Sequence, residues 1–430
     1  MQKEFQIHSL ENGMRVLTVP LPQSETVTVL TLVNTGSDYE QPFEAGISHF
    51  LEHMCFKGTV KRPTAHSILV ELDNLGAETN AFTDHEITGY YAKGDAKHWK
   101  KFVDIIADVY LNSTFPADEI EREKGVICEE INMYEDMPQN VIAERFEKFM
   151  YGNNPVGLPI LGTKESVRSF KRDDFVNYHS RQYNPQNTVI IVAGPVKNTD
   201  VNKEVEKYFK NFTGGNSSAG GKKIKKVKFE KPKNRILNIH KDTDQVHAII
   251  GFTGYDRGNV KSQKAKIISG ILASGMSSRL FQILREELGV CYYVSSGQSL
   301  HTHSGRFLIS SGITKEKVNM VMKKIIEECN KIKNQKIDEK EIQKVKNYLT
   351  GMSKMGLESS DARAYFYGSQ LLLDGNVKTI DQKIKDINNV NQNDVKKVAK
   401  ELFNFENLYI GLIGPQNYIK LTINDFKSLI

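Results

Sequence analysis

The feature that most restricts the fold of this chain is an internal repeat. The segment Asp173–Pro195, DDFVNYHSRQYNPQNTVIIVAGP, corresponds to Asn393–Pro415, NDVKKVAKELFNFENLYIGLIGP. Each copy predicts a helix, a short turn around asparagines, and a buried strand that ends at Gly-Pro. The residues identical at a constant offset of 220 are Asp174/Asp394, Asn184/Asn404, Asn187/Asn407, Gly194/Gly414 and Pro195/Pro415. Duplication of one α+β unit explains this agreement better than coincidence.

The two halves predict the same architecture. Strands arrive in hairpins, as in NAFTDHEITGYYAKG and SSGQSLHTHSGRFLISSG, and helices arrive in groups. We therefore predict an α+β protein with two homologous halves, each a mostly antiparallel sheet with helices packed on one face. The segment FTGGNSSAGGKK is rich in Gly and Ser and is typical of a flexible connector. The predicted parts are an N-terminal domain at 1–212, a linker at 213–232 and a C-terminal domain at 233–430.

Composition excludes several classes of protein. The net charge is +6, and the densest basic run, GGKKIKKVKFEKPKNR, lacks the aromatic interleaving or fold signature of a nucleic-acid site, so we interpret it as a solvated linker. The cysteines show no CxxC pair, which indicates a reducing compartment. The cysteines are Cys55, Cys128, Cys291 and Cys329. The N-terminus lacks signal-peptide character, and no apolar run reaches the ~18 residues that span a bilayer. We expect a cytoplasmic protein without a membrane partner.

The stretch SHFLEHMCFKGT, Ser48 to Thr59, carries two imidazoles and a carboxylate within an apolar run. On a helix, residues four apart lie one above the other, so His49 and His53 can hold one ion. Glu52 borders the same face and can reach a water at an open coordination position. A single histidine in such a helix is usually a hydrogen-bonded core residue, but burying all three groups without a partner is costly. The pattern favours a metal site.

A catalytic zinc ion needs a third protein ligand and an open position for water. Carboxylates are abundant in DEIEREKGVICEEINMYED, which predicts an amphipathic helix over Asp118–Asp136. Its acidic residues include Glu121, Glu123, Glu129 and Glu130. Glu123 and Glu130 are seven residues apart and share one helical face, so one can bind the ion while the other orients a ligand.

The HxxEH order is the signature of the inverzincins. The chain resembles the pitrilysin family of zinc peptidases, and most closely its compact branch, which includes the mitochondrial processing peptidase β-subunit and its bacterial relatives. The stretches that carry the resemblance lie in both halves: HFLEHMCFKGT, NAFTDHEITGYYAK, EIEREKGVICEE and LFQILREELGVCYYVSSG. It implies a zinc metalloendopeptidase with one Zn²⁺ per chain.

The resemblance also assigns individual residues. The distal glutamate ligand of the family follows the second histidine after about 76 residues, and 76 residues lie between His53 and Glu130. Glu130 is therefore the match, and Glu129 is a bystander. The implied zinc ligands are His49, His53 and Glu130, with Glu52 as the general base.

Further residues are implied around this core. Glu123 matches the family's supporting glutamate, seven residues before the ligand. In the second half, LREELGVCY supplies Arg285 and Tyr292, which can donate hydrogen bonds to the carbonyl oxygen and the backbone of a substrate. Tyr293 and Arg279 are the alternatives for these two positions.

The segment GAETNAFTDHE corresponds to the family's edge strand, which binds a peptide as an extra strand. Asn80 and Ala81 are the expected contacts with substrate. His85 and Glu86 follow and are interpreted as loop residues. Cys55, two residues after the second histidine, is interpreted as a core residue and not as a nucleophile.

The predicted function is hydrolysis of short or unfolded peptides inside a chamber formed by paired domains or subunits. Because one chain carries both sets of residues, we expect a homodimer. Two alternatives stay open at this point: a processing peptidase that acts only with a homologous partner chain, and a non-catalytic subunit for peptide binding or assembly.

Overall fold

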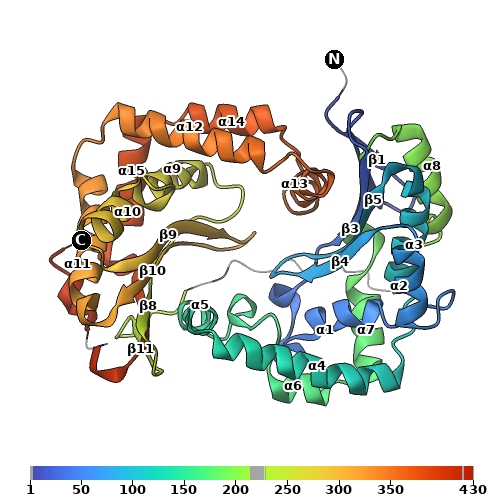
Figure 1. Ribbon diagram of the computed structural model, residues 1–430, viewed down its shortest axis with the longest axis horizontal. Helices are drawn as coiled ribbons and strands as arrows, with labels where there is room; N and C mark the ends of the chain where they lie inside the picture. The colour runs from blue at the N-terminus through green and yellow to red at the C-terminus, as the bar shows by residue number, and fades with distance from the viewer. Residues whose placement is uncertain (1–2, 214–226, 228, 419–420, 430) are drawn as a thin grey trace. The chain divides into compact units, whose positions relative to one another are not determined.

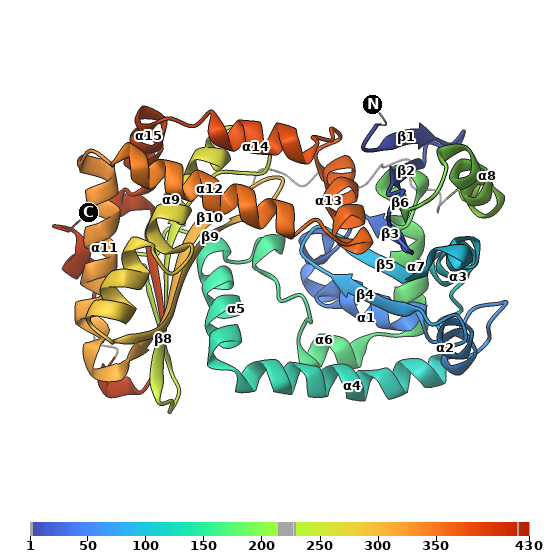
Figure 2. The ribbon, with the colours of Figure 1, turned by 45° about the horizontal axis from the view of Figure 1, so that its top comes forward.

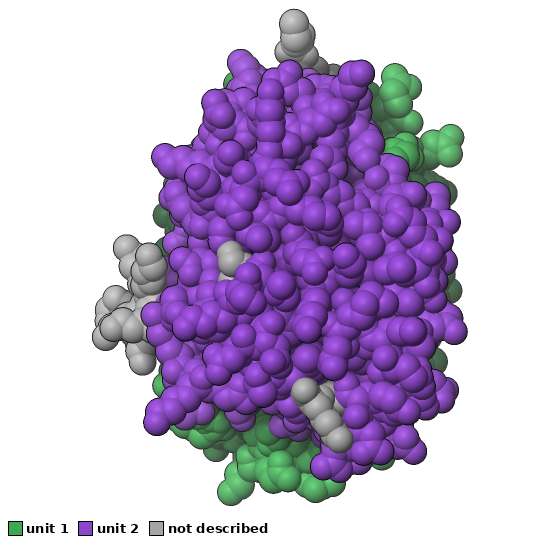
Figure 3. Space-filling view, turned by 90° about the vertical axis from the view of Figure 1, so that its left-hand side faces the viewer, with its two compact units in different colours: residues 1–132, 158–224, 355–379 green, residues 133–157, 225–354, 380–430 purple. Residues whose placement is uncertain are grey.

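The computed structural model describes residues 3–213, 227, 229–418 and 421–429 (Figure 1). Most of the predicted linker at 213–232, and with it much of the basic run, lies outside the described residues. The chain forms two compact units, each built from segments that are distant in sequence (Figure 3). The first unit holds Met1–Asn132, Leu158–Ile224 and Met355–Thr379, and the second holds Met133–Gly157, Lys225–Lys354 and Ile380–Ile430.

The first unit contains a six-stranded sheet in the order β1-β2-β6-β3-β5-β4. Its strands are β1 (Gln6–Ser9), β2 (Arg15–Pro20), β3 (Thr26–Val33), β4 (Glu78–Thr83), β5 (Thr88–Asp95) and β6 (Thr188–Gly194). Neighbouring strands are antiparallel except for β2 and β6, which run parallel. β4 is an edge strand, so one of its sides is not paired within this sheet.

Helices of the first half cover one face of this sheet. They are α1 (Ile47–Cys55), α2 (Ala65–Asp73), α3 (Trp99–Leu111), α4 (Ala117–Asp136), α6 (Lys164–Ser169), α7 (Arg172–Gln182) and α8 (Asn198–Phe209). Apolar residues of α1, α3, α7 and α8 share one core with alternate strand residues such as Val27 and Val29. This alternation is the pattern of a strand whose two faces meet different layers.

The opposite face of the first sheet is covered by a helix from the second half, α13 (Ser360–Leu373). Its Tyr367 and Leu371 share a core with Leu30, Leu32 and other strand residues of that face. Gly368 allows the close approach, because a Cβ at this position would lie 2.8 Å from Ile191 Cδ1. The sheet is therefore buried on both faces.

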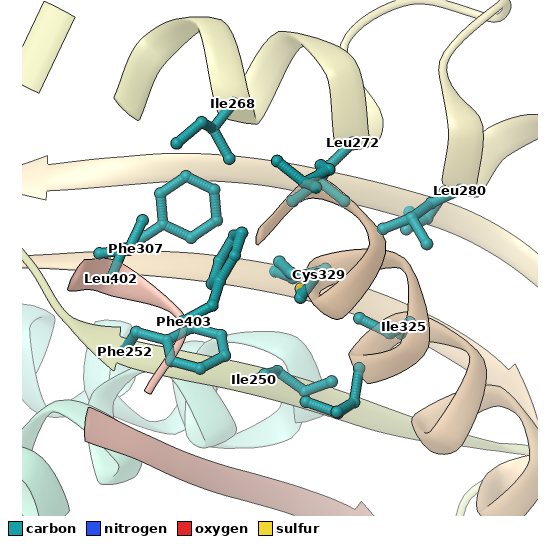
Figure 4. Packing of buried hydrophobic residues seen from close by; sticks show 14 of the residues in the cluster. Ile250, Phe252, Ile268, Leu272, Leu280, Phe307, Ile325, Cys329, Leu402 and Phe403 are labelled. Carbon is teal, nitrogen blue, oxygen red and sulfur yellow. The ribbon is translucent and has the colours of Figure 1, made fainter. Parts of the chain in front are cut away.

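The second unit repeats this plan with a five-stranded sheet in the order β7-β11-β8-β10-β9. Its strands are β7 (Ile236–His240), β8 (Gln245–Thr253), β9 (Cys291–Leu300), β10 (Gly305–Thr314) and β11 (Leu408–Gly414). Only β7 and β11 form a parallel pair. On one face, Phe252 and Phe307 pack against Phe403, with ring centroids 5.0 and 5.6 Å away, at the centre of the core (Figure 4).

Helices of the second half cover that face, and one helix of the first half covers the other (Figure 2). The helices of this unit are α5 (Pro138–Tyr151), α9 (Lys261–Ala273), α10 (Arg279–Phe281), α11 (Val318–Asn334), α12 (Glu339–Met355), α14 (Ile380–Asn388) and α15 (Gln392–Leu402). α5 is the helix contributed by the first half. Its Phe146 lies against Gly251 and Gly411 of the sheet, where a Cβ would come within 2.7 Å of the ring.

The predicted α+β class with two mostly antiparallel sheets is confirmed, and the difference from the prediction is that helices pack on both faces of each sheet and not on one. The predicted helix over Asp118–Asp136 is present as α4. Among the described helices, none combines the length and the apolar character needed to cross a membrane.

Candidate metal centre

The centre is built on α1, and a buried carboxylate fixes the start of this helix. Gly46 precedes α1 with φ 92° and provides no side-chain cap. Glu40 takes over this role: its Oε2 accepts a hydrogen bond from Gly46 N and its Oε1 one from Ser48 N, both 2.8 Å long. Because Glu40 is fully buried, these bonds satisfy amides that water does not reach.

One turn of α1 brings the two histidines together, and α4 adds a carboxylate. The rings of His49 and His53 are 4.6 Å apart between centroids. Glu130 Oε2 lies 3.5 Å from His49 Nε2 and 3.8 Å from His53 Nε2. Both imidazoles thus direct the same ring nitrogen at one carboxylate oxygen.

This arrangement fits a zinc ion. The three ligand atoms all lie within 4.8 Å of one another. Zinc bonds of ~2.0–2.2 Å in tetrahedral geometry place ligand atoms roughly 3.4 Å apart, close to the spacing seen here. Two imidazoles and one carboxylate also leave a fourth position open, as catalytic zinc sites do.

The pKa values of the two histidines are shifted in opposite directions. Burial, and then the neighbouring His53, lower the pKa of His49 to about 3, so this ring is neutral near pH 7. Burial alone would lower the pKa of His53, but the hydrogen bond with Glu123 and the nearby carboxylates raise it above its usual value. Within the described part of the chain, His49 Nδ1 is buried without a hydrogen-bond partner, whereas His53 Nδ1 lies 2.9 Å from Glu123 Oε1.

Glu123, the predicted supporting residue, lies between His53 and Lys57. Its Oε1 contacts His53 and its Oε2 lies 2.6 Å from Lys57 Nζ. Burial would raise the pKa of Glu123, yet the hydrogen bonds from these two partners hold it below its usual value. An ionised Glu123 accepts the Nδ1 proton of His53 and leaves Nε2 for a metal.

Glu52, on α1, is buried beside the candidate ligands and next to the last residue of the edge strand β4. Thr83 Oγ1 donates a 2.6 Å hydrogen bond to Glu52 Oε2. Burial raises the pKa of Glu52, and the bond from Thr83 opposes this effect. No hydrogen bond from the described residues occupies Oε1, so this oxygen is available to exchange a proton.

A pocket opens next to these residues, between α1, α2 and β4. Its lining residues are Glu52, His53, Phe56, Lys57, Leu69, Thr79, Asn80, Ala81 and Glu123. The predicted substrate contacts Asn80 and Ala81 thus lie on the wall of the same pocket as the histidines. Asn80 Oδ1 accepts a hydrogen bond from Ala81 N.

Arg285 and Tyr292 belong to the second unit and contact each other there. Arg285 Nη1 donates a 2.8 Å hydrogen bond to Tyr292 O, and its guanidinium lies 5.2 Å from the centre of the Phe281 ring. Tyr292 is 67% exposed, so its hydroxyl is accessible. Arg285 lies on a π-helical turn, Gln282–Glu287, a geometry found at many functional sites.

The alternatives for these two positions are engaged elsewhere. Arg279 forms two hydrogen bonds with the carboxylate of Glu341, 2.8 and 2.7 Å long. Tyr293 OH lies 3.2 Å from His247 Nδ1. Both alternatives therefore contact other side chains of the second unit.

Other residues near the motifs lie outside the metal group. Glu129 is exposed and is not part of the metal group. Cys55 is fully buried in the core, and burial raises the pKa of its thiol to about 12, so it is not a nucleophile near pH 7. His85 and Glu86 lie in the turn between β4 and β5.

Three residues of the centre were not found from the sequence: Glu40, Lys57 and Thr83. Lys57 had the clearest signal, since it follows His53 by one helical turn within the quoted motif. Thr83 directly follows Asn80, Ala81 and Phe82. Glu40 lies outside every motif.

Comparison with known proteins agrees with this centre. Residues 15–164 match the family described as Insulinase (Peptidase family M16), and residues 169–349 match the Peptidase M16 inactive domain. An uncharacterized zinc protease of Bacillus subtilis, YmxG, is 36% identical over 408 residues, which cover 95% of this chain and 98% of that protein. An uncharacterized zinc protease of Rickettsia bellii is 32% identical over 97% of this chain and 99% of its own length.

Solved structures share the fold. A protease from Helicobacter pylori superposes with a TM-score of 0.89 at 22% identity and covers 96% of this chain and 99% of its own. A peptidase M16 inactive domain from Pseudomonas fluorescens gives a TM-score of 0.86 at 19% identity, covering 96% of this chain and 98% of its own.

Proposed function

This chain belongs to peptidase family M16, and from that membership we propose that it is a zinc-dependent endopeptidase acting on short or unfolded peptides. The observation that carries the proposal is the group formed by His49, His53 and Glu130, with Glu52 beside it. A non-catalytic relative would not need this complete set.

In the proposed reaction, a bound zinc ion supplies a Lewis acid that acidifies water and polarises the scissile carbonyl. Glu52 takes the proton of the attacking water at Oε1 and delivers it to the leaving amine. Thr83 holds Oε2 and so fixes the direction in which Oε1 points. Glu123 keeps the imidazole of His53 in the orientation and tautomer that a metal requires.

The substrate class is inferred from the edge strand and its pocket. An extended peptide can pair with the unpaired side of β4. Such pairing uses hydrogen bonds to the peptide backbone, so it tolerates many different side chains. Such pairing requires an extended segment, so short or unfolded peptides are favoured over folded proteins. The adjacent pocket, with Phe56, Leu69 and Ala81 in its wall, offers an apolar site for one side chain.

The test of the activity is the variant Glu52→Gln. We expect it to lose roughly 10²–10⁴-fold in kcat, because it removes the proton-transfer group, and to bind zinc like the wild type. Cleavage of quenched peptides with and without chelator, together with zinc content by atomic spectroscopy, measures both. Glu129→Gln, an exposed neighbour of Glu130, is the matched control and should leave both unchanged. Full activity of Glu52→Gln would contradict the proposal.

We also propose that the active enzyme is a homodimer in which Arg285 and Tyr292 of one chain bind substrate at the zinc site of the other. The support is that one chain carries both sets of residues. Sedimentation of the purified chain should give a dimer. Glu52→Gln and Tyr292→Phe are each expected to be inactive or nearly so, but mixing them should restore up to about a quarter of wild-type activity, since mixed dimers hold one intact site. A monomer, or no restoration after subunit exchange, would contradict this.

A further inference from the structure

A lysine just beyond the second histidine contacts the carboxylate that supports this histidine. α1 ends at Cys55, and Lys57 N donates a 3.1 Å hydrogen bond to Met54 O, so the backbone of Lys57 is held against the end of the helix. From there its Nζ reaches Glu123 Oε2 at 2.6 Å. The other oxygen, Oε1, accepts from His53 Nδ1 at 2.9 Å.

This contact is buried on the side of the carboxylate. The side chain of Glu123 is only 4% exposed, and that of Lys57 is 23% exposed. A buried carboxylate needs a partner for each oxygen, because water is not there to replace a missing one. Lys57 and His53 together meet that need, so neither oxygen of Glu123 is left to turn elsewhere.

The consequence concerns the geometry of His53. Its Nε2 lies 3.8 Å from Glu130 Oε2, its Nδ1 contacts Glu123 Oε1, and the other oxygen of Glu123 contacts Lys57. Partners of this kind set the orientation of a metal-binding imidazole. On the premise that the proposed zinc site exists, we propose that Lys57 is a positioning residue for zinc binding: it anchors Glu123 so that His53 presents Nε2 to the ion.

An ion pair that does not contact a metal ligand would not have this effect, and the chain provides one for comparison: Lys61 with the buried Asp104, which Arg62 and Lys101 also contact. Lys61, four residues further on, lies 2.6 Å from Asp104 with 56% of its side chain exposed, away from the metal ligands. Lys57 also lines the pocket beside Glu52, so its other conceivable role is direct contact with substrate. Zinc affinity separates the two roles, because a substrate contact does not alter it.

The experiment measures the zinc dissociation constant of the full chain by competition with a chromophoric chelator, and the visible absorption spectrum of the Co²⁺-substituted protein. Lys57→Met removes the ammonium and keeps the length of the side chain. We expect its zinc affinity to fall ~10-fold, the lower end of the range for partners of metal ligands, and its Co²⁺ bands to change. Lys57→Arg should restore most of the affinity, and Lys61→Met should match the wild type.

Lys57→Ala carries the same test if Lys57→Met does not fold, because it also removes the contact with Glu123 and places no long apolar side chain at this position. Unchanged zinc affinity in these variants would overturn the inference. So would a change confined to the KM for peptides, which would assign Lys57 to substrate. A wild-type chain that does not bind zinc would overturn the proposed function as well, so the two failures are distinguishable.

Discussion

Histidines of the first unit show how the nearest partner decides what a buried imidazole does. Burial lowers the pKa of His49 to about 3 and that of His179 to about 4. The pKa of His53 is raised instead, because Glu123 accepts a hydrogen bond from it. His179 Nε2 lies 3.0 Å from the carbonyl oxygen of Tyr110, and its ring packs beside Tyr183. It is a neutral structural residue outside the metal centre.

We expect the half-buried His179 to make the fold less stable in acid. Its pKa is about 4 in the folded chain and 6.5 unfolded, so the unfolded state binds more protons between these values. The stabilisation is therefore complete above pH 6.5 and lost as the pH falls toward 4. A shift of this size corresponds to about 3 kcal/mol; because the side chain keeps some solvent exposure, we expect about 2 kcal/mol.

Urea unfolding at pH 7.5 and 4.5, in the presence of chelator, measures this contribution. His179→Gln can still donate to Tyr110 O but does not titrate, so its free energy of unfolding should fall less between the two pH values than that of the wild type. His66→Gln, at an exposed position of α2, is the control and should behave like the wild type. Equal pH dependence in His179→Gln and the wild type would refute the assignment.

For individual residues, the sequence predicted those contacts that depend on spacing within one helix. The i, i+4 spacing predicted that His49 and His53 meet, and they do. The choice of Glu130 over Glu129 came from the resemblance, and the structure places Glu130 beside both rings. The contacts of Thr83 with Glu52 and of Lys57 with Glu123 join distant segments, so no local pattern could predict them.

α1 depends on a cap that is not adjacent to it in sequence. Rules for helix starts consider the residue directly before the helix, which here is Gly46. The amides at the start of the helix are instead satisfied by Glu40, which lies between two short 3-10 turns, Ser37–Tyr39 and Pro42–Glu44, before the helix. The helix that carries both histidines is thus anchored by a buried side chain of the preceding loop.

Removing this cap should weaken both the fold and the metal centre. Glu40→Ala leaves two buried N–H groups without an acceptor, which costs about 2–5 kcal/mol, and Glu40→Gln should cost less because one acceptor remains. We also expect a lower zinc content, because α1 loses its fixed start. Thermal unfolding and metal analysis measure the two effects.

The control for this prediction is another helix cap. Thr163 Oγ1 accepts a hydrogen bond from Ser166 N at the exposed start of α6. Thr163→Ala should cost no more than ~1 kcal/mol and leave zinc binding intact. If Glu40→Ala proved no more harmful than Thr163→Ala, the role assigned to Glu40 would be wrong.

Residues that are identical in the two copies of the internal repeat make the same kinds of contact in both units. Asp174 and Asp394 each accept the backbone N–H three residues earlier, of Lys171 and Asn391, at 2.8 and 3.2 Å. Gly194 and Gly414 lie where a Cβ would come within 2.8 and 2.6 Å of a valine on the neighbouring strand. The duplication therefore preserved helix starts and close strand contacts, which is why it was visible in the sequence.

For the whole molecule, the notable feature is the reciprocal exchange of helices. α13 from the second half covers the first sheet, and α5 from the first half covers the second. The sequence held part of this information, because the strands TVIIVAG and LYIGLIG are apolar throughout, a pattern typical of strands buried on both faces. The sequence did not indicate which helices cover these faces, because the apolar face of an amphipathic helix does not specify the sheet on which it packs.

This exchange predicts that neither half folds fully alone. A fragment of residues 1–212 lacks α13, so the apolar face around Leu30, Leu32 and Ile191 would be exposed; a fragment of residues 213–430 lacks α5. Each fragment alone should aggregate or show weak thermal unfolding, and co-expression should give a complex that unfolds cooperatively and binds zinc.

Gly368→Val in the second fragment should weaken this complex by about 1–3 kcal/mol, because the added side chain would overpack the contact with Ile191. Gly375→Val is the control. This glycine has a positive φ and follows the end of α13, and a Cβ there meets nothing within 4 Å, so the substitution should disturb the local turn but not the packing of α13 on the sheet. Fragments that are separately stable and monomeric would show that the exchanged helices are dispensable.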